Sequence, residues 1–300
     1  MATGGALGSA MMPLQSLSLA PMGGASVSLA VLRTLGGCGS TILSRALEAA
    51  TGTVVLSETN PRSAKLFGGK LNPLQQVRTR WPHLIPEKFA HAESSLLQDA
   101  DWFAMFIAEF CRVLAECVGQ RLIIRDYNYI DFLSIPFLTL APCDSSLNKS
   151  LEKFTELSSL LLVRHPAHQL ASLLSHLASL FLLSHKVLQE ILSPEHFVQG
   201  SLAFLDTFEG YPIIKYEDFL ADPDRTLTKI SEYWNLRFDP TWQSKLGHQY
   251  KLTGDARGRS SHNIAAPAQP HAHTPQLVSA LTEHPDYDLL LSRLGYTNRE

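Results

Sequence analysis

The chain has 300 residues, of which 45% are hydrophobic and 18% are charged, so it is long enough to bury a full core. Its net charge of −3 gives no overall positive field, which argues against nonspecific nucleic-acid binding. The four cysteines form no CxxC pair and show no zinc spacing with histidine. We therefore expect reduced thiols, no metal site and a cytoplasmic location.

The first 32 residues carry no charged side chain. A secretory signal would need a basic segment at its start, and a transit peptide would be rich in arginine. We therefore expect residues 1–25 to be a disordered extension and residues 26–300 to form one α/β domain. The apolar segment 170–183 is interrupted by serine and histidine, which predicts a buried helix rather than a membrane span.

Short apolar runs that end in glycine or polar residues predict strands, in chain order, at 27–35, 53–56, 121–124, 159–163 and 211–215. Helical patterns predict helices at 42–50, 93–117, 167–192, 194–209, 222–234 and after 275. Residues 62–86 are polar and are predicted to be loop-like. Alternating strands and helices predict a three-layer, P-loop-like α/β fold, with a mostly parallel central sheet and helices on both faces.

Polar residues follow several of these strands directly. They are the segment 36–41, Glu58, Arg125 with Asp126, and Arg164. In an open parallel sheet, ligands bind at the carboxyl ends of the strands. The sequence therefore predicts one site at this edge of the sheet.

The segment 36–41 lies between the first predicted strand and the first predicted helix, and it reads Gly36, Gly37, Cys38, Gly39, Ser40, Thr41. Small residues let backbone N–H groups approach an anion, and the two hydroxyls add donors at a helix N-terminus. The alternative is an ordinary glycine turn. The lysine of a Walker A loop is missing, which disfavours a P-loop kinase.

Arg164 ends the fourth predicted strand, and Ser172 follows it by eight residues on a predicted helix. An arginine at a strand end can clamp a phosphate with two hydrogen bonds, and the serine can face the same group. Arg257 and Arg259 lie in a Gly- and Ser-rich segment that could close over a phosphate. The alternative for Arg164 is a surface ion pair with an acidic residue. The alternative for Arg257 and Arg259 is a solvated loop.

Together these segments resemble the sulfotransferases that use 3′-phosphoadenosine 5′-phosphosulfate (PAPS), over about residues 28–265. The segment 36–41 corresponds to the family's 5′-phosphosulfate loop, and it resembles a bacterial branch with Cys and Ser there. Arg164, His165, Pro166 and Ser172 match the family's second motif, which binds the 3′-phosphate. The segments 216–223 and 253–263 resemble the next strand and helix and the late 3′-phosphate loop.

The resemblance implies transfer of a sulfuryl group from PAPS, without a metal, to a hydroxyl or amine of a small-molecule or carbohydrate acceptor. It places the basic residue of the family's loop at Gly37, so another cation must supply that charge. Arg125 is our first choice, before Lys65 and Arg62. For the general base that takes the acceptor proton, Glu58 comes before Asp126. A nucleotide-binding protein of the same fold without turnover remains an alternative, as does, less favoured, a small-molecule kinase.

Overall fold

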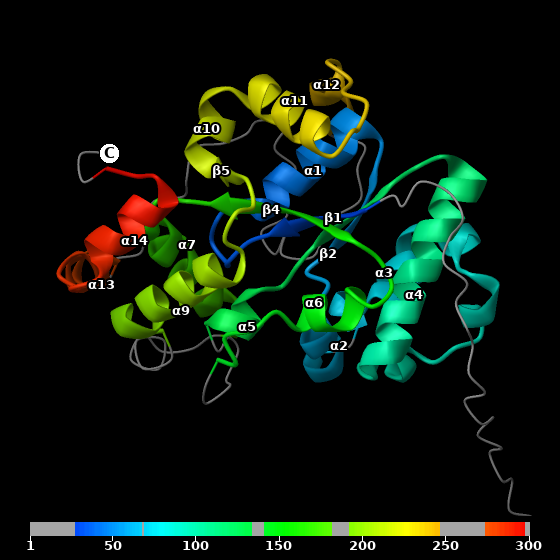
Figure 1. Cartoon of the computed structure of the whole chain (residues 1–300), viewed down its shortest axis with the longest axis horizontal. Coiled ribbons are helices and arrows are strands. Elements are labelled where there is room, and N and C mark those ends of the chain that lie inside the picture. Colours follow the sequence, from blue (N-terminus) through cyan, green and yellow to red (C-terminus); the bar gives the residue numbers. More distant parts are fainter. Residues whose placement is uncertain (1–27, 68, 134–140, 182–191, 247–273, 298–300) are drawn as a thin grey trace, which may run out of the picture.

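The computed structural model describes residues 28–67, 69–133, 141–181, 192–246 and 274–297. Its centre is a five-stranded, all-parallel sheet in the order β2-β3-β1-β4-β5 (Figure 1). The strands are β1 (Leu29–Arg33), β2 (Val54–Ser57), β3 (Leu122–Arg125), β4 (Leu157–Val163) and β5 (Ile213–Lys215). The expected parallel sheet is confirmed, and each strand lies close to its predicted place.

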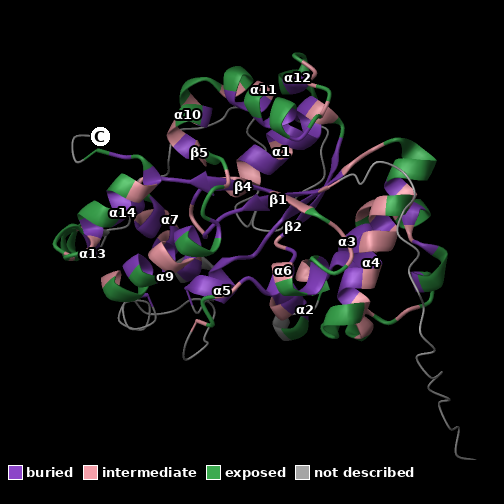
Figure 2. Ribbon diagram, viewed as in Figure 1, coloured by how far each residue is buried: buried purple, intermediate pink, exposed green. Residues whose placement is uncertain are grey.

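Helices cover both faces of the sheet, and its inner strands are largely buried (Figure 2). Strands buried on both faces are apolar on both faces, as these are. Leu29 and Val31 pack with helices on one face, whereas Ala30 and Leu32 pack with helices on the other. The first face carries α2 (Pro61–Phe67), α3 (Pro73–Arg80), α4 (Ala100–Val113) and α6 (Ser146–Leu151). The second carries α1 (Ser40–Thr51), α10 (Tyr216–Ala221), α11 (Pro223–Tyr233) and α12 (Trp242–Lys245).

A third cluster of helices packs beside the carboxyl half of β4, against Leu161 and Val163. It contains α5 (Tyr129–Phe132), α7 (Pro166–Phe181), α9 (Pro194–Thr207), α13 (Thr274–Thr282) and α14 (Tyr287–Leu294). In its described part, α7 buries Leu170, Leu173 and Leu177, as expected of a core helix. No helix in the described ranges is both long enough and apolar enough to cross a membrane.

The prediction of a loop for residues 62–86 is wrong, because α2 and α3 lie there. Asn72 caps α3 by accepting hydrogen bonds from the N–H groups of Leu74 and Gln75. Leu74 and Val77, three residues apart, are buried against the core. Because most residues of the segment are polar, its narrow apolar face gave no clear helical pattern in the sequence. The predicted helix 93–117 is regular α-helix only from Ala100, where Asp99 provides the cap.

Candidate functional site

The site begins at the turn between β1 and α1. Gly37 and Gly39 adopt φ values of 87° and 79°, in the left-handed region that favours glycine. Gly39 is the N-cap of α1, with no side-chain capping bond, and the first turn of the helix contains no acidic residue. The first N–H groups of a helix have no partner within it, and the helix dipole favours an anion there. The start of α1 therefore presents a suitable surface for a phosphate or sulfate group.

The turn is packed so closely that side chains are excluded at two of its glycines. A Cβ atom on Gly37 would lie 2.5 Å from the carbonyl oxygen of Gln169 in α7. A Cβ atom on Gly39 would lie 2.2 Å from the ring of Tyr216 in α10. The residues at these positions are therefore glycines for two reasons, backbone conformation and close approach. A basic side chain at position 37 would not fit this turn.

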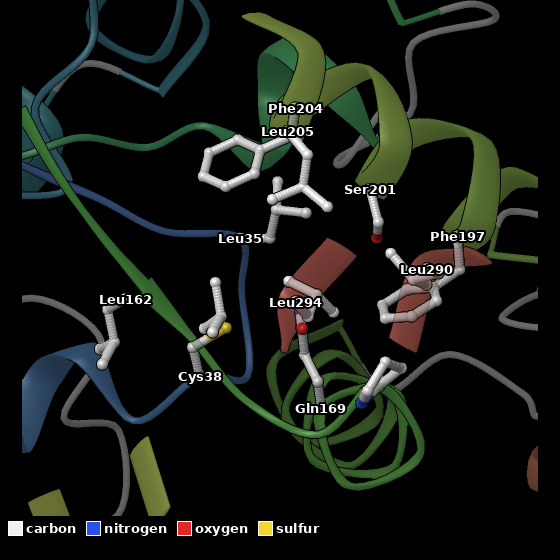
Figure 3. A pocket seen from close by; sticks show the side chains of 12 residues that line it. Leu35, Cys38, Leu162, Gln169, Phe197, Ser201, Phe204, Leu205, Leu290 and Leu294 are labelled. Carbon is white, nitrogen blue, oxygen red and sulfur yellow. The ribbon is translucent and has the colours of Figure 1, made fainter. Parts of the chain in front are cut away.

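The side chain of Cys38, between the two glycines, points into the core and away from solvent. Its thiol is fully buried, and burial raises the pKa of Cys38 to about 12. Cys38 lines a small cavity of about 10 Å³. Figure 3 shows Gln169 from α7 and Ser201 from α9 among the other side chains that line it. That volume has room for about one water molecule. A protonated, buried thiol is a packing group rather than a nucleophile.

Arg125, the last residue of β3, reaches the turn from the neighbouring strand. Its guanidinium donates to Ser40 Oγ at 3.1 Å and to Thr41 Oγ1 at 2.7 Å. It also donates to Ser57 Oγ, and it lies 3.3 Å from Glu58 Oε1. The pairing of β3 with both β1 and β2 brings these groups together at one strand edge. The result is a buried cation at the start of α1, where its charge and the helix dipole both favour an anion.

Glu58 follows β2 with an unusual backbone conformation. Its φ is 53°, which is rare for a residue with a side chain. Its carboxylate lies beside Arg125 and accepts a long hydrogen bond, 3.4 Å, from Tyr129 Oη. Tyr129 also packs against Gly36, so its ring spans the distance between the turn and Glu58. Strained residues held in this way are common at functional sites.

Asp126 lies next to Arg125 in sequence but faces a different set of groups. It pairs with Arg33 at 2.5 Å and accepts hydrogen bonds from Asn60 at 3.0 Å and Asn128 at 2.7 Å. Only 1% of Asp126 is exposed, and burial raises the pKa of its carboxyl to about 6. The contacts of Asp126 thus lie in a buried polar network, whereas those of Arg125 lie at the turn.

The other two basic candidates also differ from Arg125 in their surroundings. Arg62 pairs with Asp131 at 2.5 Å and with Asp144 at 3.0 Å, which places its charge in the network that contains Asp126. Lys65 is exposed on α2. Of the three cations, Arg125 is therefore the one that contacts Ser40 and Thr41.

Arg164 approaches the turn from the other side, at the end of β4. It donates to the carbonyl oxygen of Gly37 at 3.1 Å and lies 5.2 Å from the centre of the Tyr216 ring. Its Nε is buried and has no hydrogen-bond partner among the described residues. A buried donor of this kind suits an anionic ligand. Ser172 is half-buried in α7, and Arg257 and Arg259 lie outside the described residues.

The segment after β5 anchors the turn that follows Arg164. Glu217 accepts a hydrogen bond from the N–H group of His165 at 3.1 Å and one from Tyr296 Oη at 2.6 Å. Tyr216, the preceding residue, packs between Gly39 and Arg164. The segment therefore supports the turn through contacts with the His165 backbone, Gly39 and Arg164.

Sequence reasoning missed three contributors to the site: Ser57, Tyr129 and Tyr216. Ser57 could have been noticed, because it is the polar residue that ends an apolar strand. The two tyrosines carry no signal of this kind, since their contacts depend on α5 and α10 folding back onto the turn. Among the described residues, no group of three or more histidine, cysteine or carboxylate side chains is arranged to hold a metal ion.

No protein-family model matches the sequence, and no curated protein matches it significantly. Several solved structures are similar to the chain, and three of them are sulfotransferases. The sulfotransferase domain of the Synechococcus PCC 7002 olefin synthase has 16% identity and a TM-score of 0.47, over 86% of this chain and 96% of that one. The sulfotransferase domain of the curacin biosynthetic pathway has 14% identity and a TM-score of 0.45, over 86% of this chain and 99% of that one.

A sulfotransferase from Alicyclobacillus acidocaldarius has 12% identity and a TM-score of 0.38, over 74% of this chain and 91% of that one. The family that the sequence motifs resemble thus recurs in the names of these structures. At such identities and TM-scores, the activity of those proteins does not carry over to this chain.

Proposed function

We propose that this protein transfers a sulfuryl group from PAPS to a hydroxyl or amine of a small acceptor. The observation that carries the proposal is the position of Arg125, whose guanidinium contacts Ser40, Thr41 and Glu58 at the start of α1, which has no side-chain capping bond. In the family that the sequence resembles, a basic loop residue supplies this charge. Here the cation comes from β3, and the turn keeps a glycine at position 37.

Two groups of residues would hold the donor nucleotide. Ser40, Thr41 and the N–H groups at the start of α1 would hold its 5′-phosphosulfate end. Arg164 and Ser172 would hold the 3′-phosphate, with Arg257 and Arg259 as further contacts. The buried, unpartnered Nε of Arg164 supports this assignment, since a phosphate oxygen would satisfy it.

In the proposed reaction, an acceptor oxygen or nitrogen forms a bond to sulfur. The bond between sulfur and the bridging phosphate oxygen breaks, and its electron pair stays on that oxygen. Arg125 stabilises the developing negative charge, as preorganised donors do in other group transfers. Glu58 takes the acceptor proton. We assign Asp126 a structural role beside Arg33 rather than the second-choice role of base.

A nucleotide-binding protein without turnover is the second candidate, and the packing at Gly37 favours it. A Cβ there would lie 2.5 Å from a backbone oxygen, so the family's loop cation is excluded by the fold itself. The two candidates differ in turnover and agree in nucleotide binding.

A transfer assay with sulfur-labelled PAPS and a panel of phenols, sugars and amines separates them. We expect the wild type to label at least one acceptor and Glu58→Gln to reduce kcat by about 10²-fold. Tight binding of adenosine 3′,5′-bisphosphate without transfer to any acceptor would favour the binding protein. Failure to bind that nucleotide would reject both candidates.

A further inference from the structure

The outer edge of β2 is covered by side chains instead of a neighbouring strand. β2 is the end strand of the sheet, and its Val54 N–H donates to the carbonyl oxygen of Arg121, the residue before β3. The backbone groups of Val55 and Ser57 therefore point outward, as alternate residues do in a parallel strand. Glu48 accepts from the Val55 N–H at 3.1 Å, and Arg80 donates to the Val55 carbonyl at 2.8 Å.

Gln76, from α3, forms hydrogen bonds with both the N–H and the carbonyl group of Ser57. Its Oε1 accepts from the Ser57 N–H at 2.8 Å, and its Nε2 donates to the Ser57 carbonyl at 2.7 Å. The side chain is 6% exposed, so water does not compete freely for these bonds. One buried amide thus fixes the last residue of the strand at two points.

Ser57 directly precedes the strained residue of the site. The next residue, Glu58, has a φ of 53°, and the N–H of Thr59 then donates to the Arg125 carbonyl at 2.9 Å. A strained backbone persists only where its surroundings determine it on both sides. Gln76 provides the constraint before Glu58, and the main chain of Arg125 provides the one after it. The Ser57 hydroxyl also accepts a hydrogen bond from the Arg125 guanidinium.

We propose that Gln76 is a positioning residue, whose amide holds Ser57 and so fixes Glu58 and Arg125 relative to each other. As far as turnover is concerned, this inference rests on the proposed function. The fixing of Ser57 and Glu58 does not depend on it. Neither the sulfotransferase motifs nor the charged residues at the strand ends point to this glutamine, which lies on the far side of β2 from Arg125.

Arg80 provides a control for Gln76, because it contacts the same edge of β2. Arg80 lies one helical turn beyond Gln76 on α3, and it pairs with Glu48 at 2.6 Å while capping Val55. Its bonds thus secure β2 two residues further from Glu58. Gln76→Met removes both side-chain hydrogen bonds to the Ser57 backbone, whereas Arg80→Met removes the one to the Val55 carbonyl and leaves Glu48 on the Val55 N–H. They differ in whether the residue released adjoins the site.

The test combines three measurements on the wild type and both variants: residue-resolved amide hydrogen exchange, binding of adenosine 3′,5′-bisphosphate, and steady-state transfer kinetics. In Gln76→Met we expect the Ser57 amide to exchange about tenfold faster or more. We expect kcat to fall about tenfold or more, because small misplacements of catalytic groups are costly. The nucleotide Kd and the KM should change less than about threefold, since the contacts of Ser40 and Thr41 remain.

In Arg80→Met, exchange at Ser57 and kcat should both stay within about twofold of the wild type. Equal loss of kcat in the two variants, or unchanged exchange at Ser57 in Gln76→Met, would overturn the inference and leave an ordinary strand-edge cap. If Gln76→Met does not fold, Gln76→Glu replaces it, because its carboxylate keeps the acceptor for the Ser57 N–H but loses the donor. We then expect intermediate effects, and wild-type exchange and kcat in this variant would overturn the inference.

A folded wild type that does not bind the nucleotide would contradict the proposed function instead. In that event the exchange measurement still decides whether Gln76 fixes Ser57.

Discussion

Arg125 lies between the helix that would bind the donor and the carboxylate that would act as base. Replacing it with glutamine keeps hydrogen-bond donors but removes the charge. We expect Arg125→Gln to reduce kcat by about 10²- to 10³-fold, as loss of one charge-stabilising donor does in other enzymes. Steady-state kinetics with saturating acceptor measure the effect, and circular dichroism checks that the variant is folded.

Arg121 provides the control for this prediction, because it precedes the same strand at its other end. It donates to the Ser28 carbonyl at 2.9 Å and to the Trp234 carbonyl, remote from the turn. Arg121→Gln should lower the free energy of unfolding and leave kcat within about twofold, because it loses only peripheral hydrogen bonds. If both variants lose turnover equally, Arg125 has no special part in transfer.

The burial of Asp126 predicts that the free energy of unfolding depends on pH. Burial raises the pKa of its carboxyl from 3.8 to about 6, so the folded protein binds this proton more tightly than the unfolded chain does. Protonation therefore favours the folded state as the pH falls from about 6 towards 4. The largest slope from one group is about 1.4 kcal/mol per pH unit.

Urea unfolding of the wild type and Asp126→Asn between pH 4.5 and 7.5 measures this contribution. The unfolding free energy of the wild type minus that of the variant should rise as the pH falls through 6. A difference that falls on acidification would show that the hydrogen bonds from Arg33, Asn60 and Asn128 outweigh burial, and that the pKa is lowered instead.

At the scale of the element, the turn and α1 contain a matched pair of glycines. Gly39 precedes the helix with a φ of 79°, and an added Cβ would lie 2.2 Å from the Tyr216 ring. Gly52 follows the same helix with a φ of 66°, and an added Cβ would meet nothing within 4 Å. Both substitutions to alanine strain the backbone by about 1 to 2 kcal/mol. Only Gly39→Ala also displaces Tyr216, and with it the support of Arg164.

We therefore expect Gly39→Ala to lose nucleotide binding and to be destabilised more than Gly52→Ala, which should bind as the wild type does. Calorimetric titration and thermal unfolding of the two variants provide the comparison. Normal binding by Gly39→Ala would show that the turn is not part of the nucleotide site.

Restoring the family's basic residue should also fail. Gly37→Lys would place a side chain at a φ of 87° and against the Gln169 carbonyl. We expect lower stability and lower transfer activity, because the turn must move away from α7 to admit the side chain. Higher activity in this variant would mean that Arg125 does not replace the loop cation.

The sequence predicts individual elements well where one physical signal dominates. Apolar runs that end in glycine or charged residues located β1 to β4 closely, and the same ends suggested Glu58, Arg125 and Arg164 as candidate site residues. The helices α2 and α3 were missed, because their buried faces are narrow and their caps, such as Asn72, lie within polar sequence. Gln76 was missed for the same reason, since nothing in a polar segment indicates that one amide faces a strand edge.

At the scale of the molecule, the order of the strands decides which polar residues meet. A parallel sheet could be predicted, but not that β3 lies between β2 and β1. That order brings Arg125 to Ser40 and Glu58, and it pairs Asp126 with Arg33 from β1. Because strand order is set by packing of helices distant in the chain, the sequence pattern placed Arg125, the expected cation, and Asp126, the second-choice base, at the same sheet edge. The structure separates their surroundings.

The most direct test of the account is calorimetric titration of adenosine 3′,5′-bisphosphate into the wild type and Arg164→Ala. We predict that the wild type binds, that Arg164→Ala binds at least about tenfold more weakly through loss of a charge-assisted contact, and that AMP binds weakly to both. Absence of binding by folded wild type, or equal binding by the two proteins, would contradict the assignment of this sheet edge as the PAPS site.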